Sequence, residues 1–157
     1  PTDSGCLLFA NDRPDLAEAG GADGVHVGQG DMAVEEVRRL HPHLALGLST
    51  HDETQFDHAL DLGLDYVALG PIFPTGSKRN AEPVVGLAVL ERLAARAQAR
   101  GVPLVAIGGI HRENLHTVSS HAQLWAVIGA LLPEHGESLE PYAEVERRAR
   151  VLAAPRE

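Results

Sequence analysis

The sequence predicts an α/β fold of the (β/α)8 TIM-barrel type, with six of the eight strand–helix units, the third to the eighth, present in the chain. Short, almost wholly apolar runs alternate with segments of helical periodicity, which is typical of parallel strands buried on both faces. Glycines close the last two strands, in residues 106–110 and 126–131. Their N–H groups would form the phosphate-binding cup that is common after the seventh and eighth strands of such barrels. No glycine-rich dinucleotide fingerprint opens a helix, which also favours the barrel.

Six strands are expected where the apolar runs are bounded by turn residues. They begin at residues 6, 24, 45, 66, 103 and 124, so successive starts are 18, 21, 21, 37 and 21 residues apart. The regular step indicates a structural repeat, and its one long interval marks an unusually long loop. The expected strands cover residues 6–10, 24–28, 45–49, 66–70, 103–109 and 124–129.

Helical periodicity fills the intervals between these strands, and a further helix follows the last of them. The third helix carries a start signal, because Thr50, His51, Asp52 and Glu53 form a capping-box pattern with Thr50 as the N-cap. The helices are expected at residues 14–20, 33–40, 53–63, 86–101, 112–120 and 142–153.

Length and composition indicate one domain over residues 1–157, with the first two strand–helix units of the barrel outside the sequence. Because the sequence opens at Pro1 without an initiator Met, we expect a fragment of a longer chain. Cys6 is the only cysteine, which excludes an internal disulfide. No apolar run approaches the roughly 20 residues of a membrane span. These features predict a cytoplasmic protein without a membrane partner.

The charge of the chain bears on its partners. A formal net charge of −9, without dense patches of Lys and Arg, argues against a nucleic-acid surface. A small anionic ligand is still compatible with this charge, because a few local cations and backbone N–H groups suffice to bind it.

The long interval contains residues 70–80, GPIFPTGSKRN, at the carboxyl end of the fourth expected strand. Ligands of α/β barrels bind at this end of the strands. The loop carries the donors Thr75, Ser77 and Lys78, and Gly70 and Gly76 would give it the freedom to close over a polyphosphate. A lysine placed where a leaving pyrophosphate gains charge stabilises the transition state, although most loop lysines are simply exposed.

Five segments carry a family resemblance: NDRPDLA (11–17), GVHVGQGD (24–31), GLSTH (47–51), YVALGPIFPTGSK (66–78) and VAIGGI (105–110). In order and separation they resemble the thiamin-phosphate synthase family, which is related to a branch of thiazole tautomerases. The resemblance covers residues 8–131, and GPIFPT with its nearby lysine is the most specific element. It implies a transferase that joins 4-amino-5-hydroxymethyl-2-methylpyrimidine pyrophosphate to thiazole phosphate and releases pyrophosphate. It also implies Mg²⁺ as cofactor and phosphorylated small molecules as partners.

Asp12 and Asp31 each follow an expected strand, so a barrel would bring both carboxylates to one rim. Mg²⁺ prefers one or two such carboxylates together with phosphate oxygens and water. Both residues also precede a helical segment, where Asp is a favoured N-cap. The residues alone leave both interpretations open, and the resemblance implies that Asp12 and Asp31 bind the metal.

The resemblance also implies roles for residues in the long loop and at the strand ends. Lys78 would contact pyrophosphate and act in catalysis. Thr75 and Ser77 would hold the thiazole phosphate, with Ser77 in place of the Thr that is usual in the family. Ser49 would be a second catalytic residue, next to the pyrimidine substrate, and Asn11 would bind substrate.

Two histidines lie near these residues. His51 matches the acid/base position of the tautomerases, whereas a single histidine at such a place is more often a surface residue. His26 lies within a strand and is expected to be packed and hydrogen-bonded. The other histidines show no His-Glu-x-x-His motif and no paired cysteines, which argues against a zinc site.

The sequence departs from the family in two ways. The phosphate cup, formed by Gly109, Ile128 and Gly129, has a Ser in the family where this chain has Gly129, which removes one hydrogen bond of typically ~1 kcal/mol. The Gln-x-Arg-x-Lys pattern with which the family grips the pyrimidine pyrophosphate does not occur in this sequence. A complementing chain or a homo-oligomer is expected to cover the two strand edges that the absent units would leave open.

Two other functions are compatible with parts of this pattern. A thiazole phosphate tautomerase would keep the phosphate cup and His51, and a catalytically inactive phosphate-binding remnant would keep the core. Asp12, Asp31 and Lys78 are all present, and this counts against both alternatives.

Overall fold

The computed structural model describes residues 5–77, 82–133 and 140–153. Its strands are β1 (Phe9–Asn11), β2 (Gly24–Val27), β3 (Ala45–Thr50), β4 (Tyr66–Leu69), β5 (Leu104–Ile107) and β6 (Leu124–Ala126). Its helices are α1 (Pro14–Ala19), α2 (Val34–Leu40), α3 (Glu53–Ala59), α4 (Leu87–Arg100), α5 (Leu115–Val118) and α6 (Pro141–Ala153). Within these ranges, no helix combines the length and apolar character that crossing a bilayer requires.

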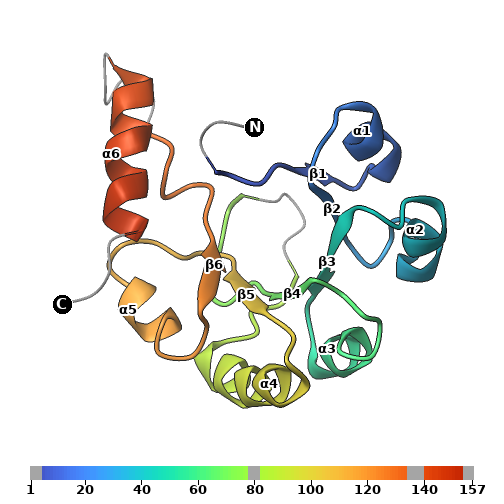
Figure 1. The fold of residues 1–157 in the computed structure, drawn as a ribbon. Coiled ribbons are helices and arrows are strands. Elements are labelled where there is room, and N and C mark those ends of the chain that lie inside the picture. The colour runs from blue at the N-terminus through green and yellow to red at the C-terminus, as the bar shows by residue number, and fades with distance from the viewer. Residues whose placement is uncertain (1–4, 78–81, 134–139, 154–157) are drawn as a thin grey trace.

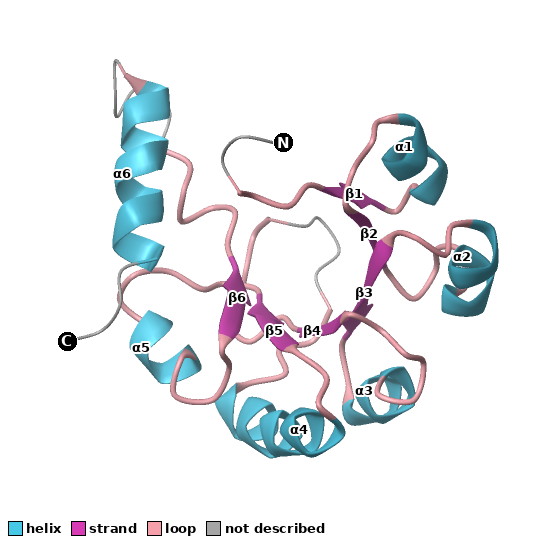
Figure 2. Ribbon diagram, in the orientation of Figure 1, coloured by secondary structure: helices cyan, strands magenta, loops and turns pink. Residues whose placement is uncertain are grey.

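The six strands form one parallel sheet in sequence order, from β1 at one edge to β6 at the other. Strand and helix alternate along the chain (Figure 2), and the sheet curls into a half-barrel with the helices on its outer side (Figure 1). The predicted α/β fold of TIM-barrel type with six βα units is confirmed. In the described part of the chain, β1 and β6 each pair with a single strand, so the sheet has two open edges.

Strand residues alternate between two environments, because successive side chains point to opposite faces. One set packs against the helices and is almost fully buried, whereas the residues between, such as His26, Ser49 and Val105, are half-buried on the inner side. The apolar runs predicted strands buried on both faces, and this is wrong for part of the inner face, where Gly47 and Ala68 are buried but His26, Ser49 and Val105 are not. The buried set is Val25, Val27, Leu46, Leu48, Val67, Leu69, Leu104 and Ala106.

The helices cover this buried set with their own apolar residues. Phe56 of α3 and Leu90 and Leu93 of α4 have no exposed surface, and Val37 of α2 is also buried. These residues recur at three- or four-residue spacing along each helix, as expected for the buried stripe of an amphipathic helix. The core therefore lies between the sheet and the helix layer.

The predicted elements are present, with shifts at their ends. β5 ends at Ile107, two residues early, because Gly108 and Gly109 have φ of 96° and 64° and leave the extended region. α5 starts at Leu115, three residues late, because a turn precedes it in which Asn114 Oδ1 accepts the His111 N–H (2.8 Å). α3 ends four residues early, at Ala59.

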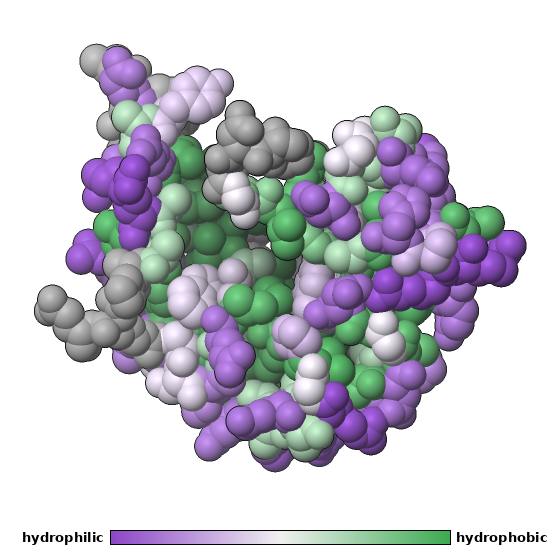
Figure 3. All heavy atoms as spheres, viewed as in Figure 1, coloured by the Kyte–Doolittle hydropathy of each residue, from purple (hydrophilic) through white to green (hydrophobic). Residues whose placement is uncertain are grey.

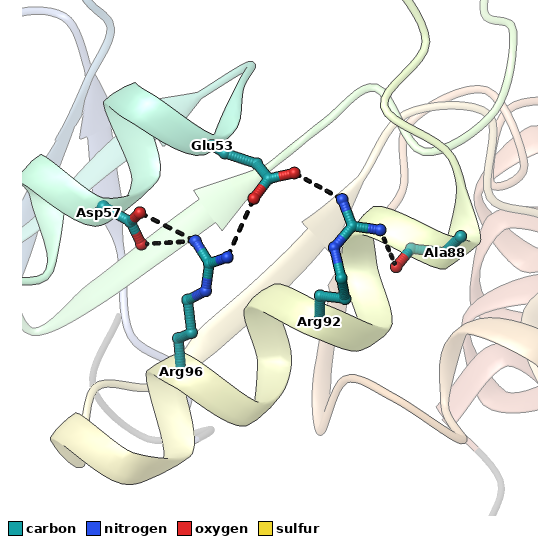
Figure 4. Close-up of polar contacts among 5 residues, drawn as sticks. All are labelled: Glu53, Asp57, Ala88, Arg92 and Arg96. Atoms are coloured by element: carbon teal, nitrogen blue, oxygen red, sulfur yellow. Dashed lines mark hydrogen bonds and ion pairs between the residues drawn. The ribbon is translucent and has the colours of Figure 1, made fainter.

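The outer contact between α3 and α4 is a ladder of ion pairs (Figure 4). The arginines are spaced four residues apart on α4, so each comes to face a carboxylate one turn further along α3 or just beyond it. Hydrogen bonding from Arg92 holds the pKa of the Glu53 carboxyl below its usual value. The pairs of this ion-pair ladder are Glu53–Arg92, Glu53–Arg96, Asp57–Arg96 and Asp61–Arg100.

Candidate active site

A cavity of about 810 Å³ opens at the carboxyl ends of β3, β4, β5 and β6. Most of the predicted binding residues line it, together with His51. They are Ser49, Thr75, Ser77, Gly109, Ile128 and Gly129. Asn11, Asp12 and Asp31 are not among its lining residues, and Lys78 lies outside the described part of the chain. The structure thus brings the phosphate cup and two loop hydroxyls to one place, because parallel strands end at the same rim.

The first part of the long loop lies across the end of β5. The N–H groups of Ile72 and Phe73 donate to the carbonyls of Ile107 and Gly108, at 2.9 and 3.1 Å. A Cβ on Gly109 would come within 2.5 Å of the Pro74 carbonyl oxygen. Glycine is therefore required in the phosphate cup for two reasons, the positive φ and the close approach of the loop.

Thr75 and Ser77 lie at the part of this loop that reaches the phosphate cup. The two hydroxyls are 3.3 Å apart, and the Ser77 N–H donates to Thr75 Oγ1 at 3.3 Å. The Ser77 hydroxyl lies 3.9 Å from the position that a Cβ on Gly129 would take. Two hydroxyls from the loop after β4 and backbone groups after β5 and β6 therefore face one small volume, which suits a phosphate group.

Asn114 also lines the cavity and binds the backbone of the phosphate cup, and the sequence analysis did not predict it. Its side-chain N–H donates to the Gly109 carbonyl at 2.9 Å, while its Oδ1 accepts from His111. The available signal was an Asn just before a helical segment, where side chains of this type close turns.

Ser49 belongs to a polar chain on the inner side of the sheet. Its hydroxyl shares a 2.8 Å hydrogen bond with His26 Nε2, and His26 Nδ1 shares one of 2.9 Å with the Tyr66 hydroxyl. The Tyr66 ring stacks on His26, and a Cβ on Gly47 would lie 2.1 Å from Tyr66. Burial raises the pKa of Tyr66 to about 12, so its hydroxyl keeps its proton at neutral pH.

The packed and hydrogen-bonded state predicted for His26 is confirmed. Tyr66 was not predicted as a site residue. Its place depends on Gly47, which lies between His26 and Tyr66 in the strand register and leaves room for the ring. A glycine within an otherwise apolar strand is a signal of such a close approach.

The predicted cap of α3 is wrong. Thr50 is the last residue of β3, fully buried, and its hydroxyl donates to the Ala68 carbonyl at 2.8 Å. Asp52 is the N-cap, and its side chain accepts the Gln55 N–H at 2.8 Å. The strand extends to Thr50, because the neighbouring strand offers its hydroxyl a carbonyl, so the helix begins later than the capping-box pattern indicated.

The two aspartates follow neighbouring strands, β1 and β2. Asp12 has a φ of 64°, and its N–H donates to the His26 carbonyl at 2.8 Å. Asp31 accepts the Gly28 N–H at 2.7 Å, and both aspartates are exposed. Neither is a helix N-cap, since those positions are Arg13 in α1 and Ala33 in α2. The capping interpretation is therefore wrong for both residues. Asn11, at the end of β1, is aligned with His26 in the register.

Among the residues that the structure describes, no group of three or more His, Cys, Asp or Glu is arranged to hold a metal ion. A magnesium site with two carboxylates does not need such a group, because phosphate oxygens and water complete its coordination. Asp12 directly follows β1 and Asp31 lies in the loop after β2, and their role as metal ligands stays a prediction.

A second cavity, of about 370 Å³, lies between α6 and the loop before α5. Arg147 and Arg148 line it, and both pair with Glu144. Hydrogen bonds from these arginines lower the pKa of the Glu144 carboxyl to about 2. Two guanidinium groups share this one carboxylate, and none of the residues predicted to bind substrate or metal lines this cavity.

Comparison with known proteins identifies the family of this chain. Residues 2–131 match the model of a family described as thiamine monophosphate synthase. The chain is 44% identical over 140 residues to the thiamine-phosphate synthase of Koribacter versatilis, which is 88% of this chain and 65% of that protein. It is 43% identical over 158 residues to the thiamine-phosphate synthase of Methanoculleus marisnigri, which is 99% of this chain and 72% of that protein.

A solved structure is also similar. The chain superposes on the thiamine phosphate pyrophosphorylase from Pyrococcus furiosus with a TM-score of 0.76 and 30% identity, over 95% of this chain and 70% of that one. The chain thus spans about two thirds of the length of the relatives that it matches. On the family match, the identities and the shared fold, this chain belongs to the thiamine monophosphate synthase family.

Proposed function

We propose that this chain carries the phosphate-binding and metal-binding part of a thiamin-phosphate synthase. In the reaction, the bond between the pyrimidine methylene carbon and the pyrophosphate oxygen breaks, and its electron pair leaves with pyrophosphate. The thiazole nitrogen then forms a C–N bond to that carbon. The observation that carries the proposal is the meeting of the phosphate cup, Thr75 and Ser77 in one cavity with Ser49.

The thiazole phosphate would bind between the long loop and the phosphate cup. Backbone N–H groups of the cup and the hydroxyls of Thr75 and Ser77 are donors suited to a phosphate dianion. Gly129 lacks the hydroxyl that the family has at this position. The Ser77 hydroxyl lies close to that place, which supports a compensating role for it.

The pyrimidine would bind on the other side of the cavity, next to Ser49. The Ser49 hydroxyl is held by the hydrogen bond that it shares with His26, whose ring is in turn stacked on Tyr66. Tyr66 stays neutral at physiological pH, so this polar chain keeps its hydrogen bonds without adding charge. Asn11, next to His26 across the sheet, would extend the same binding surface towards β1.

Asp12 and Asp31 have the ligand chemistry that a magnesium ion prefers. Both are carboxylates, neither caps a helix, and they follow adjacent strands. The left-handed backbone of Asp12 is a strained conformation, which the surrounding structure maintains at many functional sites. When bound, Mg²⁺ would neutralise the charge of the pyrophosphate and make it a better leaving group.

Lys78 is the only lysine in the sequence, and it follows Ser77 in the long loop. We propose that its ammonium group contacts the departing pyrophosphate. A positive charge there acts most strongly when negative charge develops on the leaving group, so it should affect the chemical step more than substrate capture.

We also propose that turnover needs two further βα units placed against β1 and β6. The chain spans 65% of the length of the Koribacter versatilis relative, and both edge strands have an open side in the described structure. The additional units would come from a longer chain, from a complementing chain, or from another copy in a homo-oligomer.

The test uses a chimera in which this chain replaces the matching region of the Koribacter versatilis synthase. In this chimera, Lys78→Ala should lower kcat about 100-fold or more, with a smaller change in KM, as when one stabilising donor is removed. Lys78→Arg should restore part of the rate, because the planar guanidinium places its charge differently. Single-turnover kinetics measure the chemical step directly. An unchanged chemical rate in Lys78→Ala would contradict the role of Lys78.

The metal assignment is tested in the same chimera. Asp12→Asn and Asp31→Asn should abolish Mg²⁺-dependent coupling while the far-ultraviolet circular dichroism stays unchanged, and Asp57→Asn on the outer face is the matched control. Full activity of either variant at limiting Mg²⁺ would contradict the assignment of that aspartate as a metal ligand. Metal-independent isomerisation of a thiazole phosphate, without coupling, would instead favour the tautomerase alternative.

A further inference from the structure

The long loop begins at Gly70, and both backbone polar groups of this residue form hydrogen bonds. Its N–H donates to the Thr50 carbonyl at 3.1 Å, and its own carbonyl accepts from His51 Nδ1 at 2.6 Å. Two consecutive residues at the end of β3 therefore bind both polar groups of Gly70. Gly70 has no room for a side chain, because a Cβ would lie 2.2 Å from the Ile107 carbonyl oxygen.

The contact with Gly70 determines which ring nitrogen of His51 carries hydrogen. A carbonyl oxygen can accept and cannot donate, so Nδ1 must be protonated in every charge state of the ring. The backbone of His51 is fixed as well, because its N–H donates to Gln55 Oε1 at 2.8 Å. The first turn of α3 thus holds His51, and His51 holds Gly70.

The residues after Gly70 connect this anchored position to the phosphate cup through further hydrogen bonds. Ile72 and Phe73 continue the contact through their N–H bonds to the end of β5, and the Val85 N–H returns to the Pro71 carbonyl at 2.8 Å. From this base the loop reaches Thr75 and Ser77 beside the cup. A shift of Gly70 would move each of these groups.

We propose that His51 is a positioning residue: its Nδ1–H bond to the Gly70 carbonyl sets the base of the long loop and thereby places Thr75 and Ser77 at the phosphate cup. The role of the cup in phosphate binding rests on the proposed function, whereas the anchoring of the loop does not. Since His51 acts through Gly70, the hydrogen at Nδ1 matters and the chemistry at Nε2 does not.

Three substitutions separate the two ring nitrogens. His51→Asn keeps an N–H donor near the position of Nδ1, His51→Gln places its amide near the position of Nε2, and His51→Ala removes both. His58→Ala, a change at an exposed histidine on α3, is the matched control. All four variants are made in the chimera, which supplies the two further βα units, and thermal unfolding first shows that they fold.

The first readout is amide hydrogen exchange in the absence of ligand. His51→Ala and His51→Gln should speed exchange at Ile72 and Phe73 about tenfold, the scale expected when one hydrogen bond is lost. Exchange at Val67, whose N–H bonds to the Pro103 carbonyl within the sheet, should not change. His51→Asn should restore the slow exchange. Unchanged exchange at Ile72 and Phe73 in His51→Ala would overturn the proposal.

The second readout is the nitrogen NMR spectrum of the chimera with His51 intact, here the wild type, which identifies the tautomer of His51 without any substitution at this residue. Hydrogen on Nδ1 with a bare Nε2 in the neutral ring is the expected result, and the opposite tautomer would overturn the proposal. This measurement also decides the matter if His51→Ala does not fold.

The third readout is binding of thiazole phosphate by calorimetry. His51→Ala and His51→Gln should bind about tenfold more weakly than His51→Asn and wild type. Full affinity of His51→Gln with loss in His51→Asn would show that Nε2 is the working atom and would overturn the positioning role. If the wild type does not bind thiazole phosphate while the exchange and tautomer results hold, the proposed function fails and the loop anchor stands.

Discussion

The two sides of the half-barrel are held together in different ways. On the side of α3 and α4, the central strands have a neighbour on each edge, a buried apolar core and the ion-pair ladder outside it. On the side of β1 and β6, each strand has one neighbour in the described structure, and Leu7, Leu124 and Ile128 are about half exposed or more. In Figure 3, apolar residues gather in the recess between α6 and the strands, whereas the outer helix faces are mostly hydrophilic.

The difference separates the candidate site into two parts. The phosphate cup and the long loop are built on β4, β5 and β6, with hydrogen bonds that pass from α3 through His51 and Gly70. Asp12 and Asp31 follow β1 and β2, near the open edge at β1. The long loop and Gly109 are therefore internally supported. The predicted metal ligands near β1, and the cup residues Ile128 and Gly129 after β6, lie next to the open edges and depend more on whatever covers them.

The largest expected effect concerns the open side. Unpaired strand edges with exposed leucines favour association with other copies, so the purified chain should form dimers or larger assemblies, or a loosely packed core. Analytical ultracentrifugation and circular dichroism measure this. Leu124→Lys, which adds a charge to an edge strand, should reduce the association. A monodisperse monomer with cooperative unfolding would contradict the comparison between the two sides.

A matched pair of leucines tests the comparison of core strength. Leu93→Ala on α4 should lower the free energy of unfolding by about 2–5 kcal/mol, because a fully buried side chain is lost. Leu124→Ala on β6 should cost less than about 1 kcal/mol, since that side chain is about half exposed. Chemical denaturation of both variants gives the two values. Similar losses at the two positions would mean that the open edge is covered in solution.

Two glycines with nearly equal φ separate backbone strain from crowding. Gly21→Ala (φ 65°, open space) should cost about 1–2 kcal/mol from the left-handed backbone alone. Gly109→Ala (φ 64°) should cost about 1–3 kcal/mol more, because its Cβ would meet the loop at Pro74 and force it away. Denaturation measures both losses, and hydrogen exchange at Phe73 detects the displaced loop. Equal losses would show that the loop does not rest on the phosphate cup.

The smallest effect is expected at the ion-pair ladder, because its side chains are exposed. Arg92 lowers the pKa of Glu53 in the folded state, so Glu53 stabilises the fold above its unfolded pKa of about 4.5. This contribution is lost as the pH falls through the lower folded pKa. Glu53→Gln should slightly lower Tm at neutral pH and leave it unchanged in strong acid.

Salt and a control variant complete this test. In about 1 M NaCl the difference in Tm between Glu53→Gln and the wild type should shrink, because screening acts within a few ångströms. Glu35→Gln, an exposed carboxylate on α2, is the matched control and should change Tm less than Glu53→Gln does. A Tm difference that does not respond to pH or salt would assign the effect to packing.

Much of the fold could be predicted from the sequence, because strand and helix periodicities are local. The six βα units follow from this alternation, and the long loop follows from one irregular step in the spacing. Residues that follow parallel strands must share a rim, so the grouping of Thr75, Gly109 and Gly129 was also predictable. The predicted loop residue Lys78 lies outside the described residues, and its placement stays a prediction.

The tertiary structure alone decided the contacts that depend on neighbouring strands. Thr50 is not the cap of α3, because Ala68 on the next strand provides a carbonyl for its hydroxyl. His26 and Tyr66 meet across Gly47 only through the register of three strands. Sequence by itself determined the order of the elements and the residue types at their ends, because these depend on neighbours along the chain. Which hydroxyl, carbonyl or ring each side chain meets depends on strand register and on the path of the loop, and periodicity carries no information about either.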